Sequence, residues 1–303
     1  MIPTFSSIFD LLKAFPDEKT CINHLENIRW GGIVVSPFDE TSKVYKCAGN
    51  KYKCKNTGKY FNVKVGTIFE DTKIPLQKWF MALYVFSSHK KGISSHQLAK
   101  DITVTQKSAW FMLHRLRYAF EHPAFKEVMG NPVEIDETYV AGRNKNRHSN
   151  KKLDGTGTAN KTIVFGMLER EGNVQTKVVP FNDGLTLKPI IKANIPKGNI
   201  IITDTHGAYK DLSNTFQHEI INHSAKEYVR GEFHTNSIEG FWSQLKRGIY
   251  GIYHHVTPKH LSKYGIEFAL RYNTRKDTTC NRFNLILSNA EGRLTYKTLI
   301  DRE

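Results

Sequence analysis

The chain has 303 residues, 39% of them hydrophobic, and carries 44 basic and 29 acidic residues, a formal net charge of +15 with histidine counted as neutral. This length and composition are enough to bury a sizeable core, which excludes a disordered tail, and the excess of positive charge predicts binding to a polyanion such as nucleic acid. Since there is no apolar run of about 18 residues and no signal-peptide pattern, we expect a cytoplasmic, nucleoid-associated protein with no membrane partner.

Residues 1–73 are predicted to form two short helices followed by a small basic β unit. The helical runs are FSSIFDLLKAF and CINHLENIRW. Between Lys43 and Lys64 the chain carries seven lysines, no acid, and interleaved aromatic residues in near alternation, a pattern typical of a β-hairpin. Such lysines would neutralise DNA phosphates; the alternative is a solvated strand face over an aromatic core. The expected DNA contacts of this unit are Lys51, Lys53 and Lys55.

Residues 74–125 change to a helical period. Apolar residues at i, i+3, i+4, i+7 and i+8 from Leu76 indicate a first helix, and SSHQLAKDI and TQKSAWFMLHRLRYAF indicate two more. Ser94 or Ser95 is expected to cap the second helix, and Thr103 or Thr105 the third. This arrangement predicts a helix-turn-helix.

In a helix-turn-helix the second helix of the pair presents its first turns to the base edges in the major groove. We therefore expect Gln106 and Lys107 to lie near the bases. Arg115 and Arg117, further along, are expected to contact phosphates or to form a solvated face. The alternative is a three-helix unit that serves only as scaffold or dimer contact.

Residues 131–303 alternate between strand-like runs and helices. Three early runs with short connections predict an antiparallel meander, and the later alternation predicts parallel additions, giving an α/β fold with a mixed sheet and flanking helices. This arrangement resembles a ribonuclease H-like fold, although strand order alone leaves other α/β sheets open. The basic loop RNKNRHSNKK follows the first strand, and we expect its Arg143 and Lys145 to contact DNA. The strand-like runs are VEIDETYV, TIVFGMLER, VQTKVVPF, NIIITDTHG and HEIINHS.

Three acids in this segment are candidates for catalysis. Asp136 alternates with Val133 and Ile135 on the first strand, and Asp204 ends the buried-type run IIIT. Glu239 is expected in the first turn of a helix, with Lys246 seven residues later on nearly the same face. Carboxylates from distant positions can hold Mg²⁺ or Mn²⁺, and two such ions can activate the attacking oxygen and stabilise the leaving oxygen of a phosphodiester.

Each acid also has a structural alternative, as a turn former, a cap or a partner of the helix dipole. Glu134 is expected to point the same way as Asp136 and to assist or substitute for it, and Glu137 to face the other side. The predicted DNA contacts on and beside the helix of Glu239 are Asn236, which has helix capping as an alternative, Trp242 and Arg247.

At these residues the chain resembles the DDE insertion-sequence transposases of the ISXO-like type. The matching segments are EIDETYVAG, TDTHGAY, HTNSIEGFWSQLKRGIYGIYHHV and KHLSKYGIEFALRYNTR, with WGG and GTIF to LQKWF upstream, and together they span nearly the whole chain. The resemblance implies that Asp136, Asp204 and Glu239 form a metal-binding triad and that Lys246 contacts DNA near the cleaved end. It also implies cutting and joining of DNA at the terminal inverted repeats of a mobile element.

The chain departs from the family's pattern in its N-terminal unit. That unit is normally a zinc ribbon with two cysteine pairs, whereas this chain has Ser36 and Asp39 at the first pair and Cys54 and Thr57 at the second. Because tetrahedral zinc needs about four nitrogen or sulfur ligands, we expect a degenerate ribbon without zinc. The four cysteines of the chain are too irregularly spaced for a disulfide framework.

The hypothesis that follows is a metal-dependent DNA transposase that binds terminal inverted repeats and target DNA. A homodimer on DNA is expected, because joining two ends calls for at least two active sites. A regulator or relic without catalysis, suggested by the damaged ribbon, and a structure-selective nuclease on the same fold are the alternatives.

Overall fold

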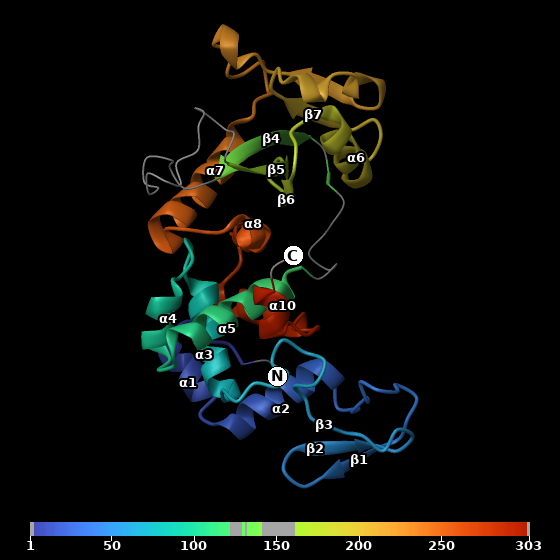
Figure 1. Ribbon diagram of the computed structural model, residues 1–303, viewed down its shortest axis with the longest axis vertical. Helices are drawn as coiled ribbons and strands as arrows, with labels where there is room; N and C mark the ends of the chain where they lie inside the picture. Colours follow the sequence, from blue (N-terminus) through green and yellow to red (C-terminus); the bar gives the residue numbers. More distant parts are fainter. Residues whose placement is uncertain (1–2, 122–128, 131, 141–160, 302–303) are drawn as a thin grey trace. The chain divides into compact units, whose positions relative to one another are not determined.

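A computed structural model describes residues 3–121, 129–130, 132–140 and 161–301 (Figure 1). The chain forms two compact units, one of residues 1–122 with 277–303 and one of residues 123–276. The predicted boundaries differ from these, because they separate residues 1–73 from 74–125 and leave the C-terminal residues with the sheet. Those residues pack with the N-terminal helices instead, because Phe283 completes an aromatic cluster with Phe5 and Phe80.

The first unit is largely helical, and the three helices predicted from Leu76 onward are present. Where the sequence allowed two caps for each of the later helices, Ser94 caps the second by accepting a hydrogen bond from the backbone N–H of Gln97, and Thr105 caps the third. The helices described in this unit are α1 (Ile8–Ala14), α2 (Glu18–Trp30), α3 (Leu76–Ser88), α4 (Ser95–Asp101), α5 (Gln106–Ala119), α9 (Thr279–Ser288) and α10 (Tyr296–Ile300).

The predicted basic β unit is a three-stranded antiparallel sheet in the first unit, in the order β1-β2-β3. Its strands are β1 (Val44–Cys47), β2 (Lys51–Cys54) and β3 (Tyr60–Phe61). Tyr52 and Phe61 are buried on one face and stack on each other, with Trp30 of α2 against both rings. In β2 the alternation therefore places Tyr52 in an aromatic core on one face and Lys51 and Lys53 on the other.

The second unit contains the predicted mixed sheet, five-stranded in the order β6-β5-β4-β7-β8. β5 pairs antiparallel with both β4 and β6, while β7 runs parallel to both β4 and β8. The strands are β4 (Val133–Val140), β5 (Thr162–Glu169), β6 (Val174–Val179), β7 (Ile200–Thr203) and β8 (Gln217–Ile220).

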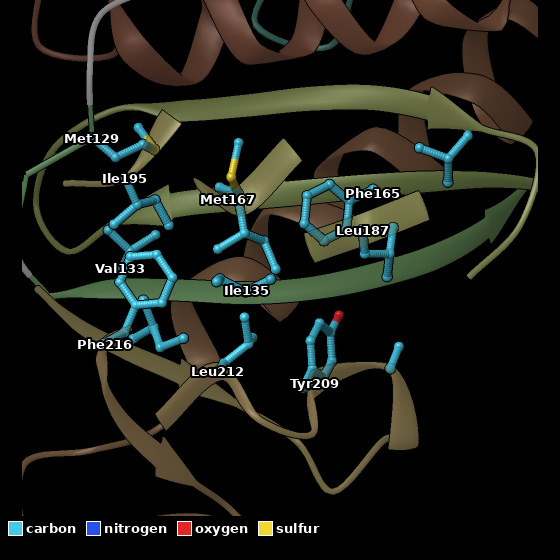
Figure 2. Close-up of a cluster of buried hydrophobic side chains, with 14 residues drawn as sticks. Met129, Val133, Ile135, Phe165, Met167, Leu187, Ile195, Tyr209, Leu212 and Phe216 are labelled. Carbon is cyan, nitrogen blue, oxygen red and sulfur yellow. The ribbon is translucent and has the colours of Figure 1, made fainter. Parts of the chain in front are cut away.

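Helices cover both faces of this sheet. On one face, side chains of β4 and β5 pack against α6 and the short helices that follow β7. Leu187 of α6 and Tyr209 of the first short helix belong to this cluster (Figure 2). On the other face, Val164 and Leu168 of β5 pack against α7 and α8. The helices are α6 (Gly184–Asn194), η4 (Gly207–Tyr209), η5 (Leu212–Asn214), η6 (His223–Ala225), α7 (Asn236–Gly248), η7 (Ile249–Tyr253) and α8 (Pro258–Asn273). Within the described residues, none of the helices has the length and apolar character needed to cross a bilayer.

Candidate active site

The parallel pairing of β4 with β7 brings two of the predicted acids side by side. Glu134 of β4 pairs with Ile202 of β7, so Asp136 and Asp204 each lie two residues beyond this pair along strands that run in the same direction. β7 ends at Thr203, and Asp204 follows directly, at the carboxyl edge where polar groups meet the solvent. Two acids separated by 67 residues in the sequence thus share one edge of the sheet.

The remaining predicted residues come from α7, which packs on β4 and β5. Glu239 lies in its first turn and Lys246 in its last, on the face turned toward Asp136. All four predicted catalytic residues line one pocket of about 320 Å³. The full lining is Asp136, Glu137, Thr138, Asp204, His223, Thr235, Glu239, Trp242, Ser243 and Lys246.

Glu134 anchors the start of α7. Its fully buried carboxylate accepts hydrogen bonds from the backbone N–H groups of Ser237 and Ile238, each at 3.0 Å, and from the guanidinium of Arg170, with an ion-pair distance of 3.2 Å. Glu134 points to the same side of the sheet as Asp136, as predicted, but it satisfies a helix terminus and does not line the pocket. It caps the helix that carries Glu239 and Lys246.

Trp242 was expected to contact DNA, and the structure gives it a different role. Only 4% of this residue is exposed, and its indole Nε1 donates a hydrogen bond of 2.9 Å to Asp136 Oδ2. Its ring lies over Gly166, the β5 residue that directly faces Asp136, where an added Cβ would come within 2.6 Å of the indole. Trp242 therefore fixes the orientation of the Asp136 carboxylate.

The electrostatics of the pocket disfavour ionisation of Asp136 and Glu137. Burial, followed by the negative charges of Glu137 and Asp204, raises the pKa of Asp136 to about 7, although the Trp242 N–H opposes the shift. Burial also raises the pKa of Glu137, while its hydrogen bond from Tyr209 opposes this. The surroundings of these two acids of β4 therefore favour their protonated forms.

Glu137 faces the other side of β4, as the alternation predicted, and it holds the loop that follows Asp204. Its carboxylate accepts a hydrogen bond from the Tyr209 hydroxyl and lies 3.6 Å from His206 Nδ1. The backbone N–H of His206 in turn donates to Asp204 Oδ1 at 2.9 Å. Glu137 and this loop therefore fix one oxygen of Asp204.

His223 and Thr235 also line the pocket, although neither was predicted as a site residue. His223 Nε2 lies 3.0 Å from the Thr235 hydroxyl and 3.6 Å from Glu239 Oε1, and Thr235 donates to the same Glu239 oxygen at 3.2 Å. A signal for His223 was present in the sequence: it comes shortly after the end of β8, and the carboxyl ends of the parallel strands β7 and β8 share an edge.

The residues present fit a hard divalent cation. Mg²⁺ prefers carboxylate oxygens and water, and Asp136, Asp204 and Glu239 offer such oxygens to one polar pocket. Among the residues described, no three histidine, cysteine or acidic side chains form a ready-made metal cage, so the carboxylates share the pocket without converging on one point. The Glu239 side chain, with 52% of its area exposed, has the most freedom to move toward the other two.

The other predicted DNA contacts differ in where they lie. Gln106 and Lys107 are exposed at the start of α5. Asn236 is exposed as the first residue of α7 but is not its cap, since Thr235 holds that position. Arg143 and Lys145 lie outside the described residues. The remaining predicted contacts, all at least partly exposed, are Lys51, Lys53, Lys55 and Arg247.

Arg115 and Arg117 are not surface residues, contrary to the expectation of phosphate contacts or a solvated face. Arg115 is 5% exposed and donates to the backbone oxygens of Ile68, Glu70 and Leu294, while Arg117 is 1% exposed. A guanidinium has five donors, so burial is tolerated where backbone oxygens accept them. This helix face packs within its own unit.

The four degenerate ribbon positions still lie close together. Ser36 and Asp39 form a β-bridge, and Asn56 donates to Asp39. Burial raises the pKa of the Cys54 thiol. Hydrogen bonds that involve the hydroxyls of Ser36, Ser42 and Thr57 outweigh this effect and lower the pKa to about 6. Hydroxyl groups therefore surround the one remaining ribbon cysteine.

Comparison with known proteins adds family information. A family model described as an ISXO2-like transposase domain matches residues 128–273. An uncharacterized protein in transposable element ISH50 of Halobacterium salinarum is 28% identical over 277 residues, covering 86% of this chain and 92% of that protein. An uncharacterized transposase-like protein of Haemophilus influenzae is 33% identical over 101 residues, covering 33% of this chain and 80% of that protein.

Among solved structures, the Mos1 strand transfer complex matches with 11% identity over 70% of this chain and 78% of that chain. Its TM-score is 0.21, too low to support a shared fold.

Proposed function

Because this chain belongs to the ISXO-like insertion-sequence transposases, we propose that it is an enzyme that cuts DNA at the terminal inverted repeats of its element and joins the released ends to target DNA. The observation that carries the proposal is the single pocket lined by Asp136, Asp204, Glu239 and Lys246, which come from β4, the end of β7 and α7. A net charge of +15 supports DNA as the substrate.

We propose a ribonuclease H-like fold for the second unit. Three antiparallel strands followed by two parallel ones, with the first acid on the central β4, support this assignment. The crossover through α6 and the final α7 put the acids of β4, β7 and α7 at one edge, where ligands bind in open α/β sheets.

In the proposed mechanism, Asp136, Asp204 and Glu239 hold Mg²⁺ or Mn²⁺. When bound, such ions activate the attacking oxygen and stabilise the leaving oxygen of a phosphodiester. Trp242 orients the Asp136 carboxylate through its N–H group, and Glu134 fixes the start of α7. Lys246 on the pocket wall binds the phosphate beside the cleaved bond, because an ammonium group there offsets the charge of the DNA backbone.

DNA recognition is proposed to reside in the first unit. α4 and α5 pack against each other and are separated by four residues, from Ile102 to Thr105, as in a helix-turn-helix. Gln106 at the exposed start of α5 is then the base-proximal residue, and Lys107 beside it contacts the phosphate backbone. A homodimer on DNA is proposed because two ends must be joined.

The test is a cleavage and strand-transfer assay with purified protein, Mg²⁺ or Mn²⁺, and DNA carrying the element's ends. The wild type is expected to cut and join, and Asp136→Asn to lose roughly 100-fold or more of both activities, because the amide is a poor metal ligand. Asp211→Asn is the matched control: it is the same change in the same unit, outside the pocket, and the left-handed backbone of Asp211 (φ 65°) tolerates asparagine.

Equal activity of wild type and Asp136→Asn would overturn the catalytic assignment. Specific binding without metal-dependent strand breaks would identify a regulator. Efficient cutting of branched DNA that lacks any terminal repeat, without joining, would identify a structure-selective nuclease.

A further inference from the structure

The outer face of the β1-β2-β3 sheet carries two exposed aromatic rings with a lysine between them. Tyr45 of β1 pairs with Lys53 of β2, and Lys53 pairs with Tyr60 of β3, so the three side chains form a row across the sheet. Cross-strand partners point to the same face, and this face is opposite the buried Tyr52 and Phe61. The pairing of the three strands therefore determines the alignment of these side chains.

The exposure of these rings has no structural explanation within the sheet. Tyr45 is 43% exposed and Tyr60 is 60% exposed, while the aromatic core on the other face is complete without them. Large aromatic side chains grouped on a surface commonly mark a binding site.

Each exposed ring is accompanied by a lysine. The Nζ atom of Lys43 lies 5.5 Å from the Tyr45 ring centroid, and that of Lys53 lies 5.5 Å from the Tyr60 centroid. The chain has no acidic residue between Lys43 and Lys64, so the three strands themselves carry only positive charge. Planar rings alternating with ammonium groups match a ligand in which planar bases alternate with phosphates.

We infer that this face binds an unpaired DNA strand, with bases stacked on Tyr45 and Tyr60 and phosphates against Lys43 and Lys53. Neighbouring strands are about 4.8 Å apart, so the two rings are separated by roughly 10 Å, about the rise of three stacked nucleotides. In a duplex the base faces are covered by their neighbours, and these rings can stack only where the strands are separated. The inference rests on the proposed function, since it concerns the same DNA when its ends are opened.

The experiment measures fluorescence anisotropy of the full-length protein, without divalent metal, on a labelled oligothymidylate and on a duplex of the element end. Changing Tyr45→Leu together with Tyr60→Leu is expected to weaken binding to the single strand roughly 30-fold or more and binding to the duplex by less than about twofold, because stacking contributes about 1–3 kcal/mol per base and two bases lose their stacking partner. Lys53→Gln is expected to reduce the dependence of log affinity on log salt by about 0.7 on the single strand.

Phe9→Leu is the matched control, because Phe9 is 63% exposed and has Lys13 Nζ 4.3 Å from its ring centroid, on α1 and away from this sheet. It is expected to leave both affinities unchanged. Circular dichroism checks that the double variant folds.

Wild-type affinity of the folded double variant for the single strand would overturn the inference, and so would equal weakening on both DNAs. Tighter binding of a matched oligouridylate than of oligothymidylate would also overturn it, by assigning the face to RNA. Since duplex binding and strand cleavage are measured separately, failure of the proposed function is distinguishable from failure of this inference.

Discussion

The folded structure favours the protonated form of the Asp136 carboxyl group. It is half-buried in the pocket lining and close to Glu137 and Asp204, and its pKa is raised from 3.8 to about 7 by burial and then by these neighbouring charges. A metal ligand must be deprotonated, so ligand binding and proton release are coupled at this residue.

The metal-free protein is therefore expected to lose stability as pH rises. Between about pH 4 and pH 7 the folded state keeps the Asp136 proton that the unfolded state has released, so the free energy of unfolding falls across this window. Asp136→Asn removes that fall, and at pH 8 it is expected to be more stable than the wild type by up to about 4 kcal/mol, since each pKa unit corresponds to about 1.4 kcal/mol. Urea denaturation with a chelator at pH 4 and pH 8 measures the difference.

Asp211→Asn serves again as the control and is expected to follow the wild type at both pH values. If Asp136→Asn gains nothing over the wild type at pH 8, the raised pKa is not a property of the folded protein. Added Mg²⁺ is expected to stabilise the wild type at pH 8 and to have less effect on Asp136→Asn.

Glu134 offers a second test, of stability and activity together. Glu134→Gln keeps an acceptor for the α7 backbone but leaves the Arg170 guanidinium without its carboxylate, so a loss of about 2–4 kcal/mol in the free energy of unfolding is expected. Cleavage is expected to fall as well, because α7 carries Glu239. The exposed Glu232→Gln is the control in both the urea titration and the cleavage assay. A change below about 0.5 kcal/mol for Glu134→Gln would mean that the cap is dispensable.

At the scale of elements, α7 is held by close packing at one end and is open near the other. A Cβ added to Gly248 would lie 1.9 Å from the Phe268 ring of α8, whereas one added to Gly240 would meet nothing within 4 Å. A glycine-to-alanine substitution at each of these two positions therefore distinguishes the effect of packing on stability from the effect of helix propensity.

Gly248→Ala is expected to lower the free energy of unfolding by about 1–3 kcal/mol, because Phe268 must move within a filled core. Gly240→Ala is expected to raise it by about 0.5–1 kcal/mol, because alanine is the better helix former. Thermal and urea unfolding of the two variants provide the comparison. Stabilisation by both would show that α7 does not pack on α8 as described.

The strands and helices were predictable because each is specified by its own residues. VEIDETYV alternates as a strand with one face in each core, and β4 has those bounds. Glu239 lies in the first turn of α7 and Lys246 in its last, as the spacing in the sequence predicted. The confirmed order of antiparallel and then parallel strands followed from connection lengths.

The contacts between elements were not predictable in this way. Glu134 binds the start of α7 across 103 residues of sequence, and no local period specifies that partner. Arg115 was predicted to be exposed because arginine usually is. It is buried instead, and its guanidinium donates hydrogen bonds to the backbone oxygens of Ile68 and Leu294. The C-terminal residues join the first unit through Phe283, which sequence order alone does not indicate.

At the scale of the whole molecule, the net charge of +15 contributes to affinity for DNA of any sequence but not to a preference for one sequence. Phosphate contacts release counterions and make binding salt-dependent on any sequence, whereas contacts to base edges discriminate between sequences. Gln106 and Lys107 are adjacent at the exposed start of α5, and in the proposed helix-turn-helix they belong to different classes. Gln106 Nε2 donates to the Ser95 hydroxyl of α4 at 2.8 Å, which holds its amide at the start of both helices, while Lys107 lies over the Tyr296 ring with Nζ 4.8 Å from the centroid.

Gln106→Ala is expected to reduce the preference for the element end over a scrambled duplex by roughly 5- to 100-fold, because a bidentate contact to a base contributes about 1–3 kcal/mol of discrimination. Its salt dependence should match the wild type. Lys107→Gln is expected to weaken binding to both duplexes equally and to lower the slope of log affinity against log salt by about 0.9, the effect of one lost phosphate contact. Anisotropy titrations of both duplexes across a range of salt concentrations measure both quantities. Equal weakening on both duplexes by Gln106→Ala would remove it from base readout, and with it the proposal that α5 reads the major groove.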